Sequence, residues 1–393
     1  MIEFVNRKGS NCYKWDSEEA QGKLPLWVAD MDFKAAPAII NALQKRLDHG
    51  VFGYAIAPDE YFAAISSWFS RRHGWKGINK ANSIPTTGIV PAISAVLKAK
   101  TMELRAKGEI RQLRVMTFTP AYNCFLSCIN NMEAELIDCP LKNENAHYKI
   151  DFTGNCEQAI KKADVLLLCN PHNPTGRVWT KDELHTLADM CLKYDTYIIS
   201  DEIHCEFMMP GQHYTPFATI AEKGNRYCVM TSASKAFNIA GLQSANIFAP
   251  DPADHQLIDR AINIHEVCDP NMFGIVATIA AYNESEKWID ELNELIYNNY
   301  LLLSDFLEHN LPELKLTTME GTYLAWVNIE QLGISAEQFC HDLSEKEHVI
   351  FNPSEMYGAK GYIRINLATS KEILTEALRR LKKFVSESYT RHT

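Results

Sequence analysis

Short apolar segments alternate with amphipathic segments between residues 84 and 248, and this alternation constrains the fold more than any other feature of the chain. The apolar segments are four or five residues long, which is typical of buried strands. Between them, residues 181–194 carry apolar side chains at helical spacing. Buried strands separated by helices predict an α/β fold, in which a mainly parallel sheet is covered by helices on both faces. The strands are expected at 83–87, 115–118, 134–137, 165–169, 197–200, 227–230 and 245–248.

The pattern changes after residue 249, where longer helical segments dominate before strand-like segments return. This change predicts a second, smaller α+β domain at the C-terminus. We expect a large domain at 49–282 and a small domain at 283–393, with residues 1–48 as an N-terminal arm that contributes to the small domain. The helices are expected at 275–282, 288–306 and 373–384, and the strands at 323–327 and 362–366.

The charge balance excludes some classes of partner. The chain of 393 residues has 49 acidic and 39 basic side chains, a net charge of −10, and no basic cluster, so a nucleic-acid or anionic membrane surface is not expected. No uncharged apolar run approaches the roughly 20 residues that span a bilayer, and the first thirty residues mix charges throughout. We therefore expect a cytoplasmic protein.

The eleven cysteines are an odd number, are scattered, and include no C-x-x-C pair. A disulfide framework needs paired cysteines in an exported chain, and a zinc site needs clustered ligands. We therefore expect reduced, mostly buried thiols and no metal site.

Residues that could bind or react with a ligand follow four of the predicted strands. Asn173 lies in a loop after one strand, Asp201 and Lys235 follow two others, and Gly88 precedes a predicted helix. Taken singly, these residues have ordinary explanations: a turn, a helix cap, a solvated lysine. Ligands of open α/β sheets, however, bind at the carboxyl ends of the strands, where these four positions are expected to meet.

Together the four positions supply what pyridoxal 5′-phosphate (PLP) requires. Lys235 can condense with the cofactor aldehyde as a Schiff base, and Asp201 can keep the pyridine nitrogen protonated. Asn173 can donate to the phenolic oxygen. A helix N-terminus suits the phosphate, as do nearby hydroxyls. The phosphate ligands are expected to be the backbone N–H groups after Gly88, at Ile89 and Val90, and the hydroxyls of Ser232 and Ser234.

Several strings resemble a known family. Residues 170–176, 200–204 and 232–235 resemble the fold-type I PLP enzymes of the aspartate aminotransferase superfamily. This resemblance implies a three-layer α/β/α large domain. Longer strings look like the MalY/PatB branch of cystathionine β-lyases, also called C–S lyases. They are residues 6–10 with 14–16, 24–33, 49–54 and 119–122.

The resemblance implies further roles around the cofactor. Lys235 would also shuttle protons, Tyr122 would stack on the pyridine ring and assist Lys235, and His204 would lie near the ring edge. Tyr54 would reach the phosphate site of a neighbouring subunit, which implies a homodimer with shared active sites. From the residues alone, His204 is equally well explained as a packed histidine, and both tyrosines as core or interface residues.

On the substrate side, the resemblance makes Arg364 the residue that binds the substrate α-carboxylate. On its own, Arg364 could be a surface ion-pair residue. The chain departs from many relatives at Gln243, where they carry a phosphate-binding arginine. The other substrate contacts are expected from Asn173, Tyr54 and the segment that includes Ala29 and Asp30.

The resemblance predicts α,β-elimination of L-cystathionine, or of a related S-substituted L-cysteine, to homocysteine or another thiol, pyruvate and ammonia. Such a reaction would belong to amino-acid metabolism and methionine biosynthesis. Two alternatives stay open. Transamination needs the same lysine, carboxylate and arginine, so the motifs do not separate it from elimination. A PLP-binding regulatory protein that acts through a protein partner is the other alternative.

Overall fold

Seven strands form the central sheet of the computed structural model, which describes residues 2–264 and 270–389. The strand order is β2-β10-β9-β8-β7-β3-β4. The two pairs that involve β10 are antiparallel, and the four other neighbouring pairs are parallel. The mainly parallel α/β sheet expected from the sequence is confirmed. Its strands are β2 (Ser83–Thr86), β3 (Arg114–Thr119), β4 (Glu135–Pro140), β7 (Val165–Cys169), β8 (Tyr197–Asp201), β9 (Tyr227–Thr231) and β10 (Ala245–Phe248).

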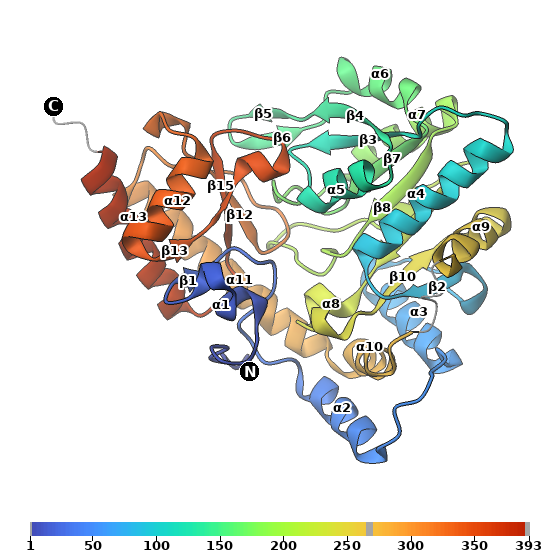
Figure 1. The fold of residues 1–393 in the computed structure, drawn as a ribbon, viewed down its shortest axis with the longest axis horizontal. Helices are drawn as coiled ribbons and strands as arrows, with labels where there is room; N and C mark the ends of the chain where they lie inside the picture. The colour runs from blue at the N-terminus through green and yellow to red at the C-terminus, as the bar shows by residue number, and fades with distance from the viewer. Residues whose placement is uncertain (1, 265–269, 390–393) are drawn as a thin grey trace.

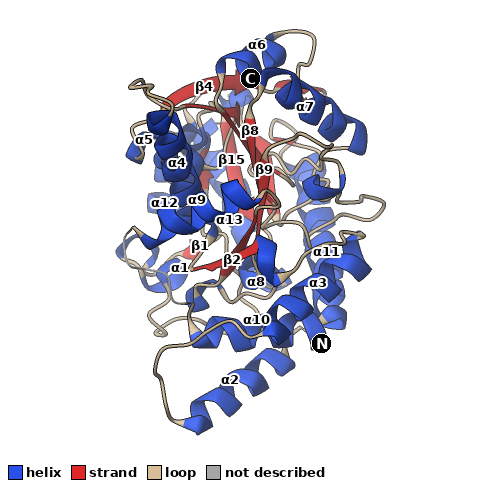
Figure 2. Ribbon diagram, turned by 90° about the vertical axis from the view of Figure 1, so that its right-hand side faces the viewer, coloured by secondary structure: helices blue, strands red, loops and turns tan. Residues whose placement is uncertain are grey.

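Helices cover both faces of this sheet and make three layers (Figure 2). Because successive side chains of a strand point to opposite faces, Val165 and Leu167 of β7 join one core cluster and Leu166 joins the other. The first cluster includes α4 (Ile89–Ala106), α5 (Asn123–Asn131) and α9 (Pro252–Asn263). The second includes α3 (Asp59–His73), α6 (Asn155–Lys162), α7 (Lys181–Tyr194) and α10 (Met272–Glu284).

A four-stranded antiparallel sheet of order β11-β12-β15-β14 forms the centre of the C-terminal part. This part is drawn in orange and red in Figure 1, and α12 and α13 pack against each other there. Its elements are β11 (Lys315–Leu316), β12 (Leu324–Asn328), β14 (Asn352–Pro353), β15 (Tyr362–Asn366), α11 (Glu286–Asn310), α12 (Ala336–Glu347) and α13 (Lys371–Tyr389).

The N-terminal segment lies beside this C-terminal part (Figure 1). After the short helix α1 (Tyr13–Asp16), β1 (Leu24–Pro25) pairs in parallel with β13 (Val349–Ile350). In contrast, α2 (Pro37–His49) packs against α10, away from the small sheet. The arm thus contacts both parts of the molecule, and the division into two domains stays a prediction. The remaining elements are the hairpin β5 (Lys142–Glu144) and β6 (His147–Lys149) and the short helix α8 (Ala233–Ala236).

Two further expectations concern cysteines and membranes. The ten described cysteines are free thiols, and nine of them are buried, while Cys268 lies outside the described residues. Among the described helices, none combines the length and the apolar character that a membrane crossing requires.

Candidate active site

The residues predicted from the strand ends meet at one cavity of about 200 Å³. It opens between the carboxyl ends of β7 and β8, the N-terminus of α4 and the short helix α8. A larger groove of about 910 Å³ lies beside α11 and β11 and contains none of the predicted residues. The predicted residues that line the smaller cavity are Ala29, Gly88, Ile89, Val90, Tyr122, Asn173, Asp201, His204, Ser234 and Lys235.

Lys235 lies in α8, where its Nζ donates a hydrogen bond to the carbonyl oxygen of Ala29 at 2.6 Å. The helix begins after Ser232, whose Oγ accepts from the backbone N–H of Ser234 at 3.0 Å. Burial lowers the pKa of the Lys235 amine, and the Asp30 carboxylate partly opposes this effect. A lowered pKa increases the fraction of neutral amine, which is the form that attacks an aldehyde.

Asp201 ends β8 and is only 2% exposed. Its Oδ1 accepts from the backbone N–H of Ile203 at 3.1 Å, and no described cationic side chain forms an ion pair with it. Burial therefore raises the pKa of its carboxyl to about 7. A protonated pyridine nitrogen beside Asp201 would supply the missing positive charge, so this residue fits PLP.

The phosphate side of the cavity is the start of α4. Gly88 precedes the helix in an extended conformation, and the first backbone N–H groups, at Ile89 and Val90, belong to residues that line the cavity. A helix of 18 residues concentrates positive potential at this end, which suits a phosphate. Ser234 lines the cavity as well, whereas the Ser232 hydroxyl donates to the carbonyl oxygen of Ser244 at 2.6 Å.

Arg364 is buried, with 4% of its surface exposed, so it is not a surface ion-pair residue. Its Nη1 donates to Oδ1 of Asn173 at 3.2 Å, and its Nη2 donates to the carbonyl oxygen of Trp27 at 2.9 Å. The guanidinium lies 4.9 Å from the ring centroid of Tyr357, and its Nε has no partner. A buried guanidinium without a carboxylate partner among the described residues is suited to a ligand carboxylate.

His204 and Tyr122 line the cavity and also pack against neighbouring rings. His204 contacts Tyr323 edge to face, with ring centroids 5.8 Å apart, and its Nδ1 has no partner. Burial lowers the pKa of His204 to about 3, so the ring is neutral at pH 7. Burial raises the pKa of Tyr122, with a further contribution from Cys124, so its hydroxyl remains a donor. Both residues therefore pack against other rings while they line the cavity, and their roles towards a cofactor stay predictions.

Three residues that the sequence analysis singled out do not line the cavity. Tyr54 is 97% exposed in the segment between α2 and α3, so its role in a second subunit stays a prediction. Asp30 forms a bidentate pair with Arg7, both N–O distances being 2.8 Å. Gln243 is exposed, at the end of the turn that follows α8.

Several side chains that shape the site could not be identified from sequence motifs. Tyr323 donates to the carbonyl oxygen of Ala29 at 2.9 Å, and Asn238 bonds to the backbone of Met31. These contacts join residues about 200 to 300 positions apart, so no local motif reveals them. The remaining lining residues that were not predicted are Pro91, Cys169, Ile203 and Ala240.

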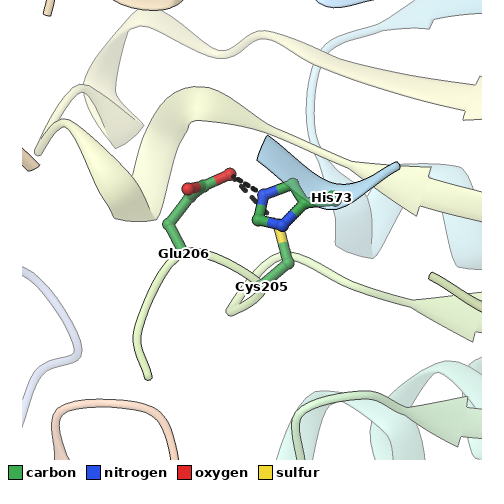
Figure 3. Close-up of side chains that lie close together, drawn as sticks. All are labelled: His73, Cys205 and Glu206. Carbon is green, nitrogen blue, oxygen red and sulfur yellow. Dashed lines mark hydrogen bonds and ion pairs between the residues drawn. The ribbon is translucent and has the colours of Figure 1, made fainter. Parts of the chain in front are cut away.

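A second polar cluster lies apart from the cavity, where ligand atoms of His73, Cys205 and Glu206 lie within 4.8 Å of one another (Figure 3). Glu206 Oε1 accepts from Trp68 Nε1 and His73 Nε2, each at 2.7 Å, and Arg72 Nε donates to its Oε2 at 3.2 Å. The carboxylate is already bonded by these groups, one of them a guanidinium. We therefore interpret the cluster as a buried hydrogen-bond network.

The three-layer fold and the lysine, carboxylate and amide around one cavity define a protein of fold type I. Residues 22–381 match the family described as aminotransferase class I and II, and the chain belongs to this family. Cystathionine beta-lyase PatB of Bacillus subtilis is 34% identical over 97% of this chain and 98% of its own length.

Two solved structures have the same fold. A PLP-bound putative aminotransferase from Clostridium difficile is 39% identical, with a TM-score of 0.91, over 97% of this chain and 98% of that chain. A PLP-bound C–S lyase from Staphylococcus hominis, in complex with L-cycloserine, is 30% identical, with a TM-score of 0.89, over 99% of each chain. The resemblance identified from the sequence motifs is thereby confirmed.

Proposed function

We propose that this PLP-dependent enzyme is a carbon–sulfur β-lyase. With consumption of one water molecule, it would convert L-cystathionine, or a related S-substituted L-cysteine, to homocysteine or another thiol, pyruvate and ammonia. One observation carries the choice of a lyase: the 34% identity to a cystathionine β-lyase extends over nearly the whole of both chains. The named C–S lyase among the solved structures supports the same choice.

The cavity residues suggest how the chain would hold its cofactor. PLP supplies an electron sink for negative charge that develops on the substrate Cα. We assign Lys235 to the covalent attachment, Asp201 to the pyridine nitrogen and Asn173 to the phenolic oxygen. The N-terminus of α4 and Ser234 would bind the phosphate.

Arg364 would bind the substrate carboxylate and thereby fix the orientation of Cα. Its Nε has no partner, and the Nε–H and an Nη2 N–H of a guanidinium point the same way along one edge, which matches the two oxygens of a carboxylate. Asn173 already accepts from this guanidinium, so the amide helps to fix its position. With the carboxylate held there, we assign removal of the Cα proton to the amine of Lys235.

Lys235 would then act first as a base and later as an acid. Because burial lowers the pKa of its amine, the neutral form is available to accept the Cα proton. The resulting ammonium can protonate the departing thiolate. Burial keeps the Tyr122 hydroxyl protonated, so Tyr122 can donate to the sulfur as well.

The chain is also proposed to act as a homodimer. Tyr54 lies on the surface among Val51, Phe52 and Ile56, all of them exposed. A second copy that covers this segment would bury these side chains and would bring Tyr54 to the partner's phosphate site.

The deciding experiment incubates the purified holoenzyme with L-cystathionine and no keto acid, and measures pyruvate and free thiol. We expect both products in equal amounts. Strict dependence on an added keto acid would instead identify an aminotransferase, as the name of the Clostridium difficile relative suggests.

Two variants serve as controls. Lys235→Ala should lose the visible absorption of the lysine-bound cofactor and the activity together. Arg364→Lys should keep the absorption but raise KM by about 10- to 100-fold, because a lysine cannot make the bidentate contact. Absence of both reactions in a protein that binds PLP would favour the regulatory alternative.

A further inference from the structure

Residues 27–33 form a largely irregular segment that is hydrogen-bonded both to the four-stranded sheet and to α8, the helix of Lys235, and we call it the bridging segment. All of its carbonyl oxygens, from Trp27 to Phe33, accept hydrogen bonds from groups outside it. Irregular backbone normally exchanges such bonds with water. Here distant side chains determine the conformation instead. The donors are Val5, Arg7, Lys14, Lys235, Asn238, Tyr323, Asn352, Arg364 and Asn366.

One end of this network contacts the lysine of the candidate site. The carbonyl oxygen of Ala29 accepts from Lys235 Nζ at 2.6 Å and from the Tyr323 hydroxyl at 2.9 Å. Asn238, three residues beyond Lys235, bonds to both the N–H and the carbonyl oxygen of Met31, at 3.1 and 3.0 Å. The position of the bridging segment is thus tied to the position of Lys235.

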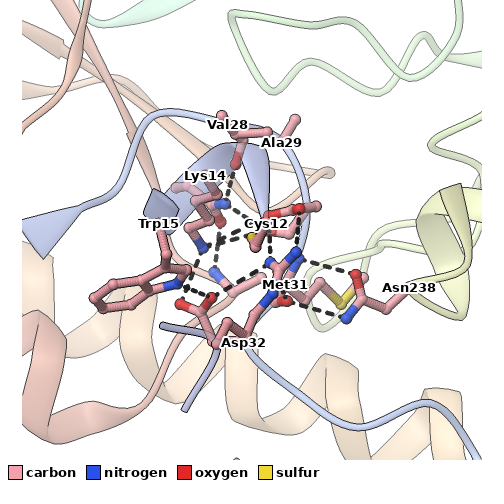
Figure 4. A network of polar contacts seen from close by, with 12 residues as sticks. Cys12, Lys14, Trp15, Val28, Ala29, Met31, Asp32 and Asn238 are labelled. Atoms are coloured by element: carbon pink, nitrogen blue, oxygen red, sulfur yellow. Dashed lines mark hydrogen bonds and ion pairs between the residues drawn. The ribbon is translucent and has the colours of Figure 1, made fainter. Parts of the chain in front are cut away.

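The other end is held by the N-terminal residues (Figure 4). Lys14 Nζ lies 3.0 Å from Asp32 Oδ2, and both side chains have no exposed surface. Trp15 Nε1 donates to Asp32 Oδ1 at 2.8 Å. Arg7 forms an ion pair with the Asp30 carboxylate through Nη1 and Nη2, and its Nη1 also donates to the carbonyl oxygen of Met31 at 2.9 Å. These residues belong to the strings 6–10 and 14–16, to which the proposed reaction assigns no role.

A purely stabilising role is a poor explanation for these ion pairs. The desolvation of a fully buried pair such as Lys14–Asp32 offsets most of its attraction, and an apolar pair of similar size often serves stability as well. What the charges provide is a defined geometry, because each fixes a particular backbone position. Arg7 also balances the charge of Asp30, whose carboxylate acts on Lys235.

We propose that Arg7 and Lys14 are positioning residues, which hold the bridging segment against Lys235 and balance the charge of Asp30 beside it. They would act on the lysine without touching substrate or cofactor. The proposal rests on the role of Lys235 in the proposed function. It does not depend on whether the enzyme eliminates a thiol or transfers an amino group.

The test titrates the visible absorption of the lysine-bound cofactor in the holoenzyme without substrate. Arg7→Gln removes the closer of the two cations that balance the Asp30 carboxylate and leaves Lys14, whose Nζ lies 3.9 Å from Asp30 Oδ1. The less balanced negative charge favours the protonated form of the lysine nitrogen. We expect its pKa to rise by about one unit. Asp30→Asn removes the negative charge that acts on Lys235 and leaves Arg7 with Asp32, 3.6 Å from its Nη1, as its remaining carboxylate. The pKa should therefore fall by a similar amount, and the double variant should return close to the wild-type value. The other titratable or charged groups that face Lys235 are Cys124, Tyr122, Asp201, His204, Tyr323 and Arg364.

A second readout addresses position. Hydrogen–deuterium exchange in residues 27–33 of the holoenzyme should increase at least several-fold in Arg7→Gln. The matched control is Lys34→Gln, which removes an exposed ion pair with Glu3 in the same part of the chain. The control should change neither the exchange nor the titration. Lys14→Met would probe the buried pair, but the test does not require that variant to fold.

Two results would overturn the proposal. One is an unchanged titration in both Arg7→Gln and Asp30→Asn, whatever happens to the melting temperature. The other is a shift in the same direction in both variants. Because neither readout involves turnover, failure of the lyase assay would leave this test intact, and failure of this test would leave the lyase assay intact.

Discussion

At the scale of single residues, the candidate site depends on a carboxyl that is costly to ionise in the cofactor-free protein. Burial raises the pKa of Asp201 from its ordinary value of 3.8 to about 7. The folded state therefore binds more protons at this position than the unfolded state does. Between these two pKa values, stability falls as pH rises.

We therefore expect Asp201→Asn to stabilise the cofactor-free protein relative to wild type, more at pH 8 than at pH 5. The gain between these pH values should be a few kcal/mol at most, since one pKa unit corresponds to about 1.4 kcal/mol. Urea unfolding of both proteins at the two pH values measures the difference. Asp189→Asn, at an exposed position on α7, is the control and should show no such gain. A variant that is no more stable at pH 8 than at pH 5, relative to wild type, would contradict the expectation.

The residue scale also shows which parts of the site a sequence can predict. Asn173, Asp201 and Lys235 could be predicted because each lies at the carboxyl end of a strand or four residues beyond it, and parallel strands bring these ends to one edge. Arg7 and Tyr323 could not, because their partners depend on how the small sheet and the N-terminal segment pack together. Long-range contacts of this kind have no local pattern.

At the scale of elements, local signals predicted the type and often the limits of helices and strands. Four predicted ranges, 165–169, 181–194, 245–248 and 362–366, coincide with β7, α7, β10 and β15. The helix expected at 275–282 is longer, since α10 begins directly after Asn271, whose side chain accepts from the N–H of Phe273. Apolar periodicity marks only the buried part of such a helix.

Strand β4 shows the opposite limit. It was expected at 134–137 but extends from Glu135 to Pro140, because its pairing with β3 continues beyond the apolar residues. As an edge strand it needs fewer apolar side chains than a central one. The reversed direction of β10 was not predicted either, since an apolar run of four residues carries no information about direction.

The start of α7 gives a prediction at this scale. Thr180 accepts from the N–H of Glu183, and the Glu183 carboxylate accepts from the N–H of Thr180, which is a capping box. Thr180→Ala should lower the free energy of unfolding by about 1 kcal/mol, measured in urea. KM and kcat should not change, because Thr180 does not line the cavity. Thr186→Ala, inside the same helix, should cost much less, and an equal loss in both variants would refute the capping role.

At the scale of the whole molecule, the surface between α2 and α3 argues for a second copy of the chain. Large apolar side chains on a monomer are usually scattered singly. Here Val51, Phe52, Tyr54 and Ile56 are exposed within six residues, and Leu47 of α2 is exposed nearby. Such a surface is expected where two subunits meet.

The role proposed for Tyr54 at a partner's phosphate site would also require a dimer, and both arguments can be tested together. The wild-type holoenzyme should sediment at twice the mass of one chain, and Ile56→Asp should shift it towards the monomer, because a buried unpaired charge opposes association. Tyr54→Phe should leave the mass unchanged but weaken PLP binding by about 10-fold, the cost of one hydrogen bond to a charged group. A monomeric wild-type enzyme that retains full activity would exclude shared sites, whereas loss of PLP affinity in a dimeric Tyr54→Phe variant would link the exposed tyrosine to the phosphate of a neighbouring subunit.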